Sequence, residues 1–505
     1  MKVNYIFGIA LSVSSVLFMS SCSEDIMDKI NKDEQHPSTG VVDGRLQITD
    51  AEVATVYSVL CGSYAWYVSS YTEQLFGTGN GQLKDVEIRR LSEMSASTSF
   101  DNEWNSTYLN LNNLVVIKSK CAEGGVNADQ YDLLGMEQTL EALNWGTLTD
   151  LHGDIPCSQC FGDISAPKID KQDIIYNHIF ELLDSAQINF AKGGDNVGSH
   201  DLLFSGDLSK WEGLADALKA RYLLHTYGRN KAVLNTVIKE ANEAIAAGFT
   251  GCNLDIFNGN GADNSWSAYF WSREYIGSSK TVDDLLLDRK DPREPIYNLK
   301  YKYGKNVPIT DAVGIPGNKD QAEETEAINI PAWLNNGAAY LHVFSKSELY
   351  FILAECKARL GLDAKADFET AVTASIDDYF DTGGSVAGVK LTDTTISDYL
   401  VSLKDRYGAN PLKEIMIQKY IAQTRDEQLE TYNDMRRCRY TDGSYYVKMT
   451  NPNNTVNGSN CWPLRLPYGN SDVVSNPNVK AAFGTGNSAG AYVFTEPVWW
   501  AGGQR

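Results

Sequence analysis

The strongest constraint on the fold is a run of helical periodicity between Gly206 and Gly248. Its second half carries apolar residues at the spacing of one helix face: Leu234, Val237, Ile238, Ala241 and Ile245. The first half has a similar stripe, Asp207 or Ser209 can cap its start, and Gly228 marks the turn between the halves. Because one helix pair cannot bury both of its apolar sides, the run predicts further pairs packed beside it.

Similar helical patterns recur along the chain. We predict helices over 50–67, 102–120, 129–151, 170–190, 346–361, 364–378 and 411–435. Between them lie segments without this period, at 71–100, 249–345, 375–410 and 438–505. Small residues at Ala354, Gly361, Ala364 and Ala371 resemble those that let paired tetratricopeptide helices touch. We therefore expect a mainly α fold, a tetratricopeptide-like helical-repeat scaffold with large irregular, loop-rich insertions near 249–345 and 438–505.

The charge of the chain narrows the classes of ligand. There are 44 Lys and Arg against 65 Asp and Glu, a net charge of -21. Such a balance argues against nucleic acid, because binding phosphates requires a basic surface. Neutral sugars and basic peptides remain as ligand classes that the charge allows. Aromatic residues make up 11% of the chain, and aromatic planes either pack in a core or bind a ligand.

The N-terminus predicts export and a lipid anchor. The apolar stretch from Tyr5 to Met19 is too short for a comfortable membrane span. Small residues precede Cys22, as in the lipobox of bacterial lipoproteins, where cleavage leaves an acylated cysteine in first place. We expect a signal peptide over 1–21, a lipidated tether over 22–46 and a helical domain over 47–505. The alternative is an ordinary secretory signal with an unmodified cysteine.

The other cysteines give no metal signal. Cys157 and Cys160 form a C-x-x-C with no second pair nearby, which argues against zinc. We expect a loop disulfide or two free thiols there, since the sequence does not determine how cysteines pair. No metal site and no cofactor is predicted.

Enzyme motifs are missing from the sequence as well. There is no G-x-S-x-G, H-E-x-x-H or P-loop. Asp150 and His152 precede the turn Gly153–Pro156, but glycine and proline there are sufficient to end a helix. A glycoside hydrolase needs only two facing carboxylates, and 65 acidic residues leave that alternative open. No catalytic residue is assigned.

An ordered set of stretches resembles the SusD/RagB family of outer-membrane lipoproteins, in its SusD-like branch. The stretches are Leu148–Pro156, Pro167–Ala186, Asp201–Arg221, Ser347–Gly361, Glu414–Arg437 and Val498–Trp500. The resemblance runs from the lipobox almost to the C-terminus. It implies a tetratricopeptide-like frame with a loop-rich part that faces ligand. It also implies a binding protein rather than an enzyme, and a SusC-like TonB-dependent transporter as partner.

From this resemblance we expect a cell-surface lipoprotein that captures oligosaccharide and delivers it to the transporter. The acidic residues Glu24 and Asp25 after Cys22 resemble the surface-export signal of Bacteroidetes lipoproteins, which implies an outer-membrane anchor facing the cell exterior. Capture of peptide, as in the RagB branch, is the main alternative. A surface glycoside hydrolase and a periplasmic helical-repeat scaffold are further ones.

Aromatic residues outside the helical pattern predict the ligand site. A flat ring matches the apolar C–H face of a sugar, and polar side chains match the hydroxyl groups at its edge. Two loops offer this combination, one near residue 270 and one after the first helix. The predicted binding residues are Trp266, Tyr269, Trp271, Arg273, Tyr67 and Tyr71. The alternative for the first group is a hydrophobic knot that holds the insertion together.

Other conspicuous side chains are assigned structural roles. The tryptophans expected in the core are Trp104, Trp145 and Trp211, which lie on helical stretches. His225 falls on an apolar stripe and is expected to be a satisfied interior histidine. Arg436 and Arg437 are expected at a helix C-terminus, where cations interact favourably with the helix dipole.

Overall fold

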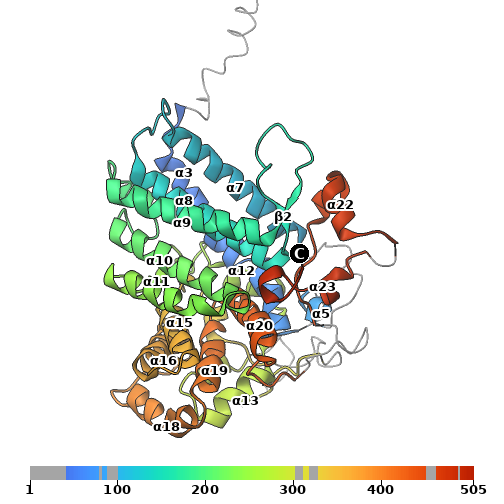
Figure 1. Cartoon of the computed structure of the whole chain (residues 1–505). Helices are drawn as coiled ribbons and strands as arrows, with labels where there is room; N and C mark the ends of the chain where they lie inside the picture. Colours follow the sequence, from blue (N-terminus) through green and yellow to red (C-terminus); the bar gives the residue numbers. More distant parts are fainter. Residues whose placement is uncertain are drawn as a thin grey trace, which may run out of the picture.

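Helices make up nearly all of the regular structure in the computed structural model (Figure 1). The structure describes residues 41–78, 82–87, 100–301, 311–317, 328–450, 462–486 and 489–504. The signal peptide, Cys22 and the tether up to residue 40 lie outside these ranges, so they stay predictions. Within the described ranges, no helix combines the length and the apolar character needed to cross a membrane.

The N-terminal half forms the first part of the frame. Its helices are α3 (Arg45–Val53), the π-helix η2 (Ala54–Leu60), α4 (Ser63–Tyr71), α5 (Gln82–Glu87), α7 (Asp101–Cys121), α8 (Tyr131–His152), α9 (Gln172–Lys192), α10 (Leu208–His225) and α11 (Leu234–Ala246). α8 packs against both α7 and α9, and α10 packs against α11 (Figure 1). The Asp207 carboxylate caps α10 by accepting from the Ser209 N–H, as its position in the sequence predicted.

The C-terminal half continues the stack. Its helices are α12 (Ser265–Arg273), α13 (Lys280–Arg289), α14 (Glu294–Tyr297), α15 (Lys346–Arg359), α16 (Lys365–Tyr379), α17 (Ser385–Ala387), α18 (Thr395–Ala409), α19 (Pro411–Gln423), α20 (Gln428–Asp442), α21 (Asn470–Ser475), α22 (Pro477–Phe483) and α23 (Tyr492–Thr495). α15 packs against α11, α16 and α19, so the second half extends the first (Figure 1). The predicted mainly α scaffold of helix pairs is confirmed.

Three short antiparallel ladders tie the irregular segments to the frame. β1 (Leu75–Gly77) pairs with β5 (Ile276–Ser278), β2 (Ile155–Pro156) with β3 (Ile169–Asp170), and β4 (Cys252–Leu254) with β6 (Leu341–Phe344). In the first ladder, Leu75 lies opposite Ser278. This ladder joins the segment after α4 to the segment after α12, although some 200 residues separate them in the sequence.

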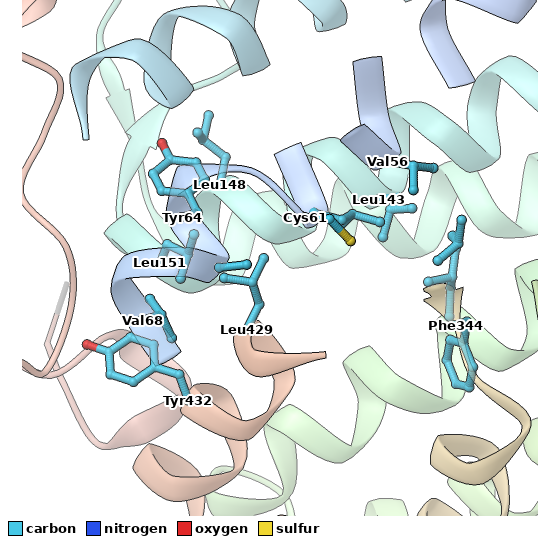
Figure 2. Close-up of a cluster of buried hydrophobic side chains, with 14 of the residues drawn as sticks. Val56, Cys61, Tyr64, Val68, Leu143, Leu148, Leu151, Phe344, Leu429 and Tyr432 are labelled. Atoms are coloured by element: carbon cyan, nitrogen blue, oxygen red, sulfur yellow. The ribbon is translucent and has the colours of Figure 1, made fainter. Parts of the chain in front are cut away.

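The core is continuous across the helix pairs. Figure 2 shows α4, α8 and α20 meeting through Val68, Leu151 and Leu429, all of which are buried. Trp104, Trp145 and Trp211 are buried too, which confirms their predicted place in the core. A smaller apolar cluster joins α15, α16, α18 and α19. Each amphipathic helix therefore finds the neighbour that its apolar face requires.

Several helical features differ from the sequence-based expectation, and the single helix predicted over 50–67 is divided among α3, η2 and α4. The single helix predicted over 411–435 is two helices, because α19 ends at Gln423 and α20 begins at Gln428. Asp426, in the connection, adopts a left-handed backbone with φ 66°, which an α-helix cannot contain. The segment 375–410, predicted to lack helical order, includes α18. Short helices also occur inside the loop-rich segment 249–345.

One glycine sets the distance between α8 and α10. A Cβ on Gly146 would lie 2.2 Å from the Tyr222 hydroxyl oxygen, and Tyr222 is itself buried. We expect Gly146→Ala to lower the free energy of unfolding by roughly 1–3 kcal/mol, the usual cost of overpacking. Gly408 in α18 is the matched control, because a Cβ there would meet nothing within 4 Å. Gly408→Ala should leave the urea midpoint unchanged or slightly higher; equal midpoints for the two variants would contradict the close packing.

Candidate ligand-binding site

The residues predicted to lie on two ligand loops lie instead on the helices α4 and α12, which contact each other. α4 leads into β1 and α12 leads into β5, so the β1–β5 ladder holds the ends of the two helices together. The Thr78 N–H extends the ladder by donating to the Tyr275 carbonyl at 2.9 Å. Trp66 of α4 stacks on Tyr269 of α12, with ring centroids 4.0 Å apart and planes 17° from parallel. An aromatic cluster therefore bridges the two helices.

The predicted aromatic residues differ sharply in exposure. Trp271 is 54% exposed, whereas Trp266 is 1% exposed and Tyr269 is 8% exposed. Tyr67 and Tyr71 of α4 are also buried. A sugar stacks on an open ring face, and of the predicted rings Trp271 offers one to solvent in this structure.

The cause of this difference is a helix that the sequence-based prediction missed. Residues expected to lack helical order form α12, and Asn264 caps it by accepting from the Ser267 N–H at 3.0 Å. The helical period turns Trp266 and Tyr269 towards the frame and leaves Trp271 outside. Arg273 is exposed at the end of the helix. Whether these residues bind ligand stays a prediction.

Buried polar atoms without a hydrogen-bond partner gather around the same helices. Among the described residues, they include the indole Nε1 atoms of Trp66 and Trp266 and the hydroxyl groups of Ser267 and Tyr269. Buried polar groups are almost always bonded to protein, water or a ligand. These four donor groups of α4 and α12 are therefore left without a protein partner in the described part of the chain.

Glu274 fixes the C-terminal end of α12. It adopts a left-handed conformation, with φ 52°, that stops the helix. Its carboxylate accepts from the Tyr301 hydroxyl at 2.9 Å, and its carbonyl accepts from the Thr78 hydroxyl at 2.7 Å. Tyr301 in turn packs edge-on against Phe270, the neighbour of Trp271. The aromatic helix is thus held at its end by side chains from two other segments, through Thr78 and Tyr301.

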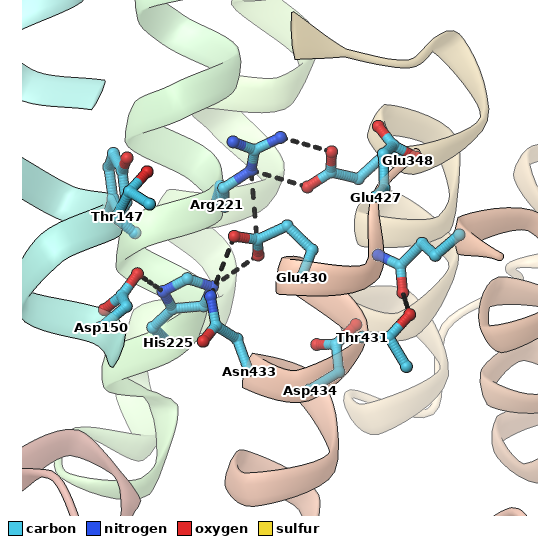
Figure 3. A network of polar contacts seen from close by, with 12 residues as sticks. Thr147, Asp150, Arg221, His225, Glu348, Glu427, Glu430, Thr431, Asn433 and Asp434 are labelled. Carbon is cyan, nitrogen blue, oxygen red and sulfur yellow. Dashed lines mark hydrogen bonds and ion pairs between the residues drawn. The ribbon is translucent and has the colours of Figure 1, made fainter. Parts of the chain in front are cut away.

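A second polar cluster lies inside the helical frame (Figure 3). On α10, the Arg221 guanidinium binds both carboxylate oxygens of Glu348, at 2.7 and 2.5 Å. One turn further, His225 lies between Glu430 and Asp150, at 2.9 Å from Nε2 and 3.2 Å from Nδ1. All of these side chains are largely shielded from solvent, so the cluster links α8, α10, α15 and α20 through buried charge.

The surroundings of His225 favour its protonated, imidazolium form. Burial lowers its pKa, but the carboxylates of Asp150 and Glu430 outweigh burial and raise the pKa of His225 to about 9. Burial opposes ionisation of Glu430, but the charges of His225 and Arg221 prevail and lower its pKa to about 2. The expectation of a satisfied interior histidine is confirmed.

The same cluster resembles a metal or catalytic site in its residue types. Asp150, His225 and Glu430 bring ligand atoms within 4.8 Å of one another. The adjoining cavity measures only about 30 Å³, which holds one water molecule rather than a substrate. Since both ring nitrogens of His225 already pair with these carboxylates and the cavity is too small for a substrate, we assign the cluster a structural role.

Arg436 and Arg437 were predicted at a helix C-terminus, and this prediction is wrong. α20 continues to Asp442, and both side chains are buried. Arg437 binds the two carboxylate oxygens of Glu355 at 2.6 and 2.9 Å and also contacts Asp434. Arg436 lies over the rings of Tyr432 and Trp500. The pair therefore joins α20 to α15 and to the C-terminal segment instead of capping a helix.

Comparisons with known proteins agree with this architecture. A SusD-like family model, described as "Starch-binding associating with outer membrane", matches residues 82–469. A solved SusD/RagB family protein from Bacteroides thetaiotaomicron is 33% identical, with a TM-score of 0.82, and the match covers 92% of this chain and 100% of that chain. No curated protein matches the chain.

Two more distant solved structures share the fold. One, titled a chitin-binding protein, is 23% identical, with a TM-score of 0.69 over 91% of this chain and 99% of that chain. The other is a chitin-binding SusD homolog from Flavobacterium johnsoniae, 18% identical, with a TM-score of 0.66 over 90% of this chain and 98% of that chain. At these identities the likeness concerns the fold alone.

The charge of His225 gives a testable pH dependence. Its pKa is raised from 6.5 to about 9 in the folded chain, so its stabilising effect is complete below 6.5 and is lost as pH rises through 9. We expect the free energy of unfolding to fall by roughly 1–3 kcal/mol across that window, on the order of the linkage for a shift of this size.

Urea unfolding of His225→Gln measures this effect, since the variant should lose the decline between pH 6.5 and 9. His200→Gln is the control, because His200 is exposed and should keep the pH dependence of the unmodified chain. Identical profiles for His225→Gln and the unmodified chain would show that the histidine is not the titrating group.

Proposed function

Because this chain belongs to the SusD-like family of starch-binding proteins associated with the outer membrane, we propose that it captures an oligosaccharide at the cell surface. The family consists of binding proteins, and this chain has the helical frame of that family. We further propose that it delivers the ligand to a SusC-like TonB-dependent transporter and is anchored to the outer membrane through a lipid on Cys22. The chitin-binding titles of two relatives with the same fold support a glycan ligand.

The observation that carries the proposal is the aromatic cluster of α4 and α12. Trp271 offers an exposed ring on the outer side of α12, while Tyr269 stacks on Trp66 on the buried side. The unpartnered buried groups on α4 and α12 are neutral indole N–H and hydroxyl groups. Such groups suit the hydroxyl groups of a sugar, while the rings suit its C–H faces.

The buried cluster around His225 does not support a hydrolase. A hydrolase would need two carboxylates facing a space for substrate. Asp150 and Glu430 instead share a buried imidazolium beside a cavity of about 30 Å³. Capture of peptide remains the second candidate, since indole and hydroxyl groups also bind peptide carbonyls.

Replacement of the exposed ring tests the ligand site. We expect Trp271→Ala to weaken oligosaccharide binding about tenfold, because loss of a stacked ring costs on the order of 1–2 kcal/mol. Calorimetry with starch, chitin and peptide fragments measures the change. Tyr440→Ala is a control, because Tyr440 is a similarly exposed ring, 43% accessible, on α20.

The outcomes separate the candidates. Equal affinities of Trp271→Ala, Tyr440→Ala and the unmodified chain for the best glycan would remove α12 from the site. Binding of peptide fragments alone would favour the RagB type of function. New reducing ends after incubation with glycans would establish a hydrolase.

The lipid anchor has its own test. Cys22→Ser is expected to shift the chain from the membrane fraction to the soluble fraction, because stable anchoring depends on the buried acyl chains. Fractionation of cells followed by detection of the chain measures this shift. Cys157→Ser, which changes another cysteine, should stay with the membrane. Retention of Cys22→Ser in the membrane would exclude lipidation at this position.

A further inference from the structure

The loop between β2 and β3 holds two cysteines that the proposed function does not use. Cys157 and Cys160 are the ends of one β-turn, in which the Cys160 N–H donates to the Cys157 carbonyl at 3.1 Å. The Asp170 carboxylate holds this turn, since it accepts from the N–H groups of Cys157 at 3.2 Å and Ser158 at 2.7 Å. The Ser158 hydroxyl adds a third bond to the same carboxylate at 3.0 Å. The backbone that carries both thiols is therefore fixed.

Both thiols line one cavity of about 610 Å³. Its walls come from α7, α8, α9 and this turn, so it shares no element with the aromatic cluster of α4 and α12. The two cysteines are half-buried. The other described cysteines are either fully buried or, like Cys121 on α7, half-buried and outside this cavity. A small reagent that enters the cavity thus meets two neighbouring thiols.

The turn also has the span that a disulfide requires. The first and fourth residues of a β-turn have Cα atoms less than about 7 Å apart. A disulfide joins residues whose Cα atoms are about 4.4–6.8 Å apart. Because Asp170 binds the backbone and the Ser158 hydroxyl, and neither sulfur, the two side chains can rotate towards each other without breaking its hydrogen bonds.

We propose that Cys157 and Cys160 form a thiol–disulfide exchange site at this cavity, with low-molecular-weight disulfides as the reactant. One cysteine thiolate attacks a sulfur of the external disulfide and expels one thiolate, which gives a mixed disulfide. The second cysteine thiolate attacks the protein sulfur of that bond, expels the other small thiolate and closes the Cys157–Cys160 bond. The two cysteines are oxidised, the external disulfide is reduced to two thiols, and the protons of the cysteines pass to them.

The surroundings of the thiols affect the rate and the result of this reaction. Burial, followed by nearby carboxylates, raises the pKa of both thiols, that of Cys160 to about 12. The thiolate is scarce at neutral pH, so exchange should be slow and should become faster with rising pH. The reduced state gains little from thiolate formation, which favours the closed disulfide at equilibrium.

The test uses the full chain, first reduced and freed of reductant, without denaturant. It is incubated with oxidised glutathione at mildly alkaline pH, then treated with an alkylating agent and analysed by peptide mass mapping. We expect the peptide with Cys157 and Cys160 to carry neither alkyl group nor glutathione and to lose two hydrogens in mass. Cys160→Ser should instead keep glutathione on Cys157, and Cys157→Ser should keep it on Cys160.

Cys121→Ser is the matched control, because it removes a half-buried thiol outside the cavity and should leave closure unchanged. Alkylation of both cysteines in the oxidised sample would overturn the proposal, as would a stable glutathione on each of them in the unmodified chain. The unmodified chain alone decides between these results, so the proposal remains testable even if a serine variant fails to fold.

Discussion

The frame depends on charges that are buried between its helices. Arg221 and His225 on α10 pair with Glu348 on α15 and Glu430 on α20, and Arg437 on α20 pairs with Glu355 on α15. Apolar faces alone allow a helix several neighbours, whereas a buried charge tolerates only a position with a matching partner. Removal of one partner from such a pair typically costs about 3–5 kcal/mol, because an uncompensated charge is left behind. The ion pairs therefore select which helices lie together.

This selection explains how the irregular segments beside α4 and α12 can hold a defined shape. α20, fixed by its charges, packs against α4, and α4 leads into the β1–β5 ladder. That ladder continues from α12, whose ring Tyr269 stacks on Trp66 of α4. The aromatic cluster thus rests on the frame through α4 and on the ladder through α12. The proposed site would therefore be preformed, and a preformed site loses little conformational entropy when ligand binds.

The sequence predicted the frame because repeated apolar faces give a strong 3.6-residue signal, as at α10 with α11. It could not predict the break between α19 and α20, since Asp426 has no sequence feature that marks its left-handed backbone. It also could not separate buried Trp266 from exposed Trp271, because α12 is short and is flanked by turn residues. One signal in the sequence could have revealed the buried ion pair. Arg221 lies beside Leu218 and Tyr222 on an apolar stripe, where a charged residue needs a buried partner.

The buried cluster also shows why residue types alone do not define a catalytic site. Asp150, His225 and Glu430 could act as acid, base and orienting group if a substrate reached them. Here His225 carries a proton that both carboxylates stabilise, so its release would leave two buried negative charges close together. A general base must accept a proton near neutral pH, and a histidine with a pKa of about 9 is already protonated there. The arrangement that stabilises the frame therefore leaves this cluster without a base that is free to accept a proton near neutral pH.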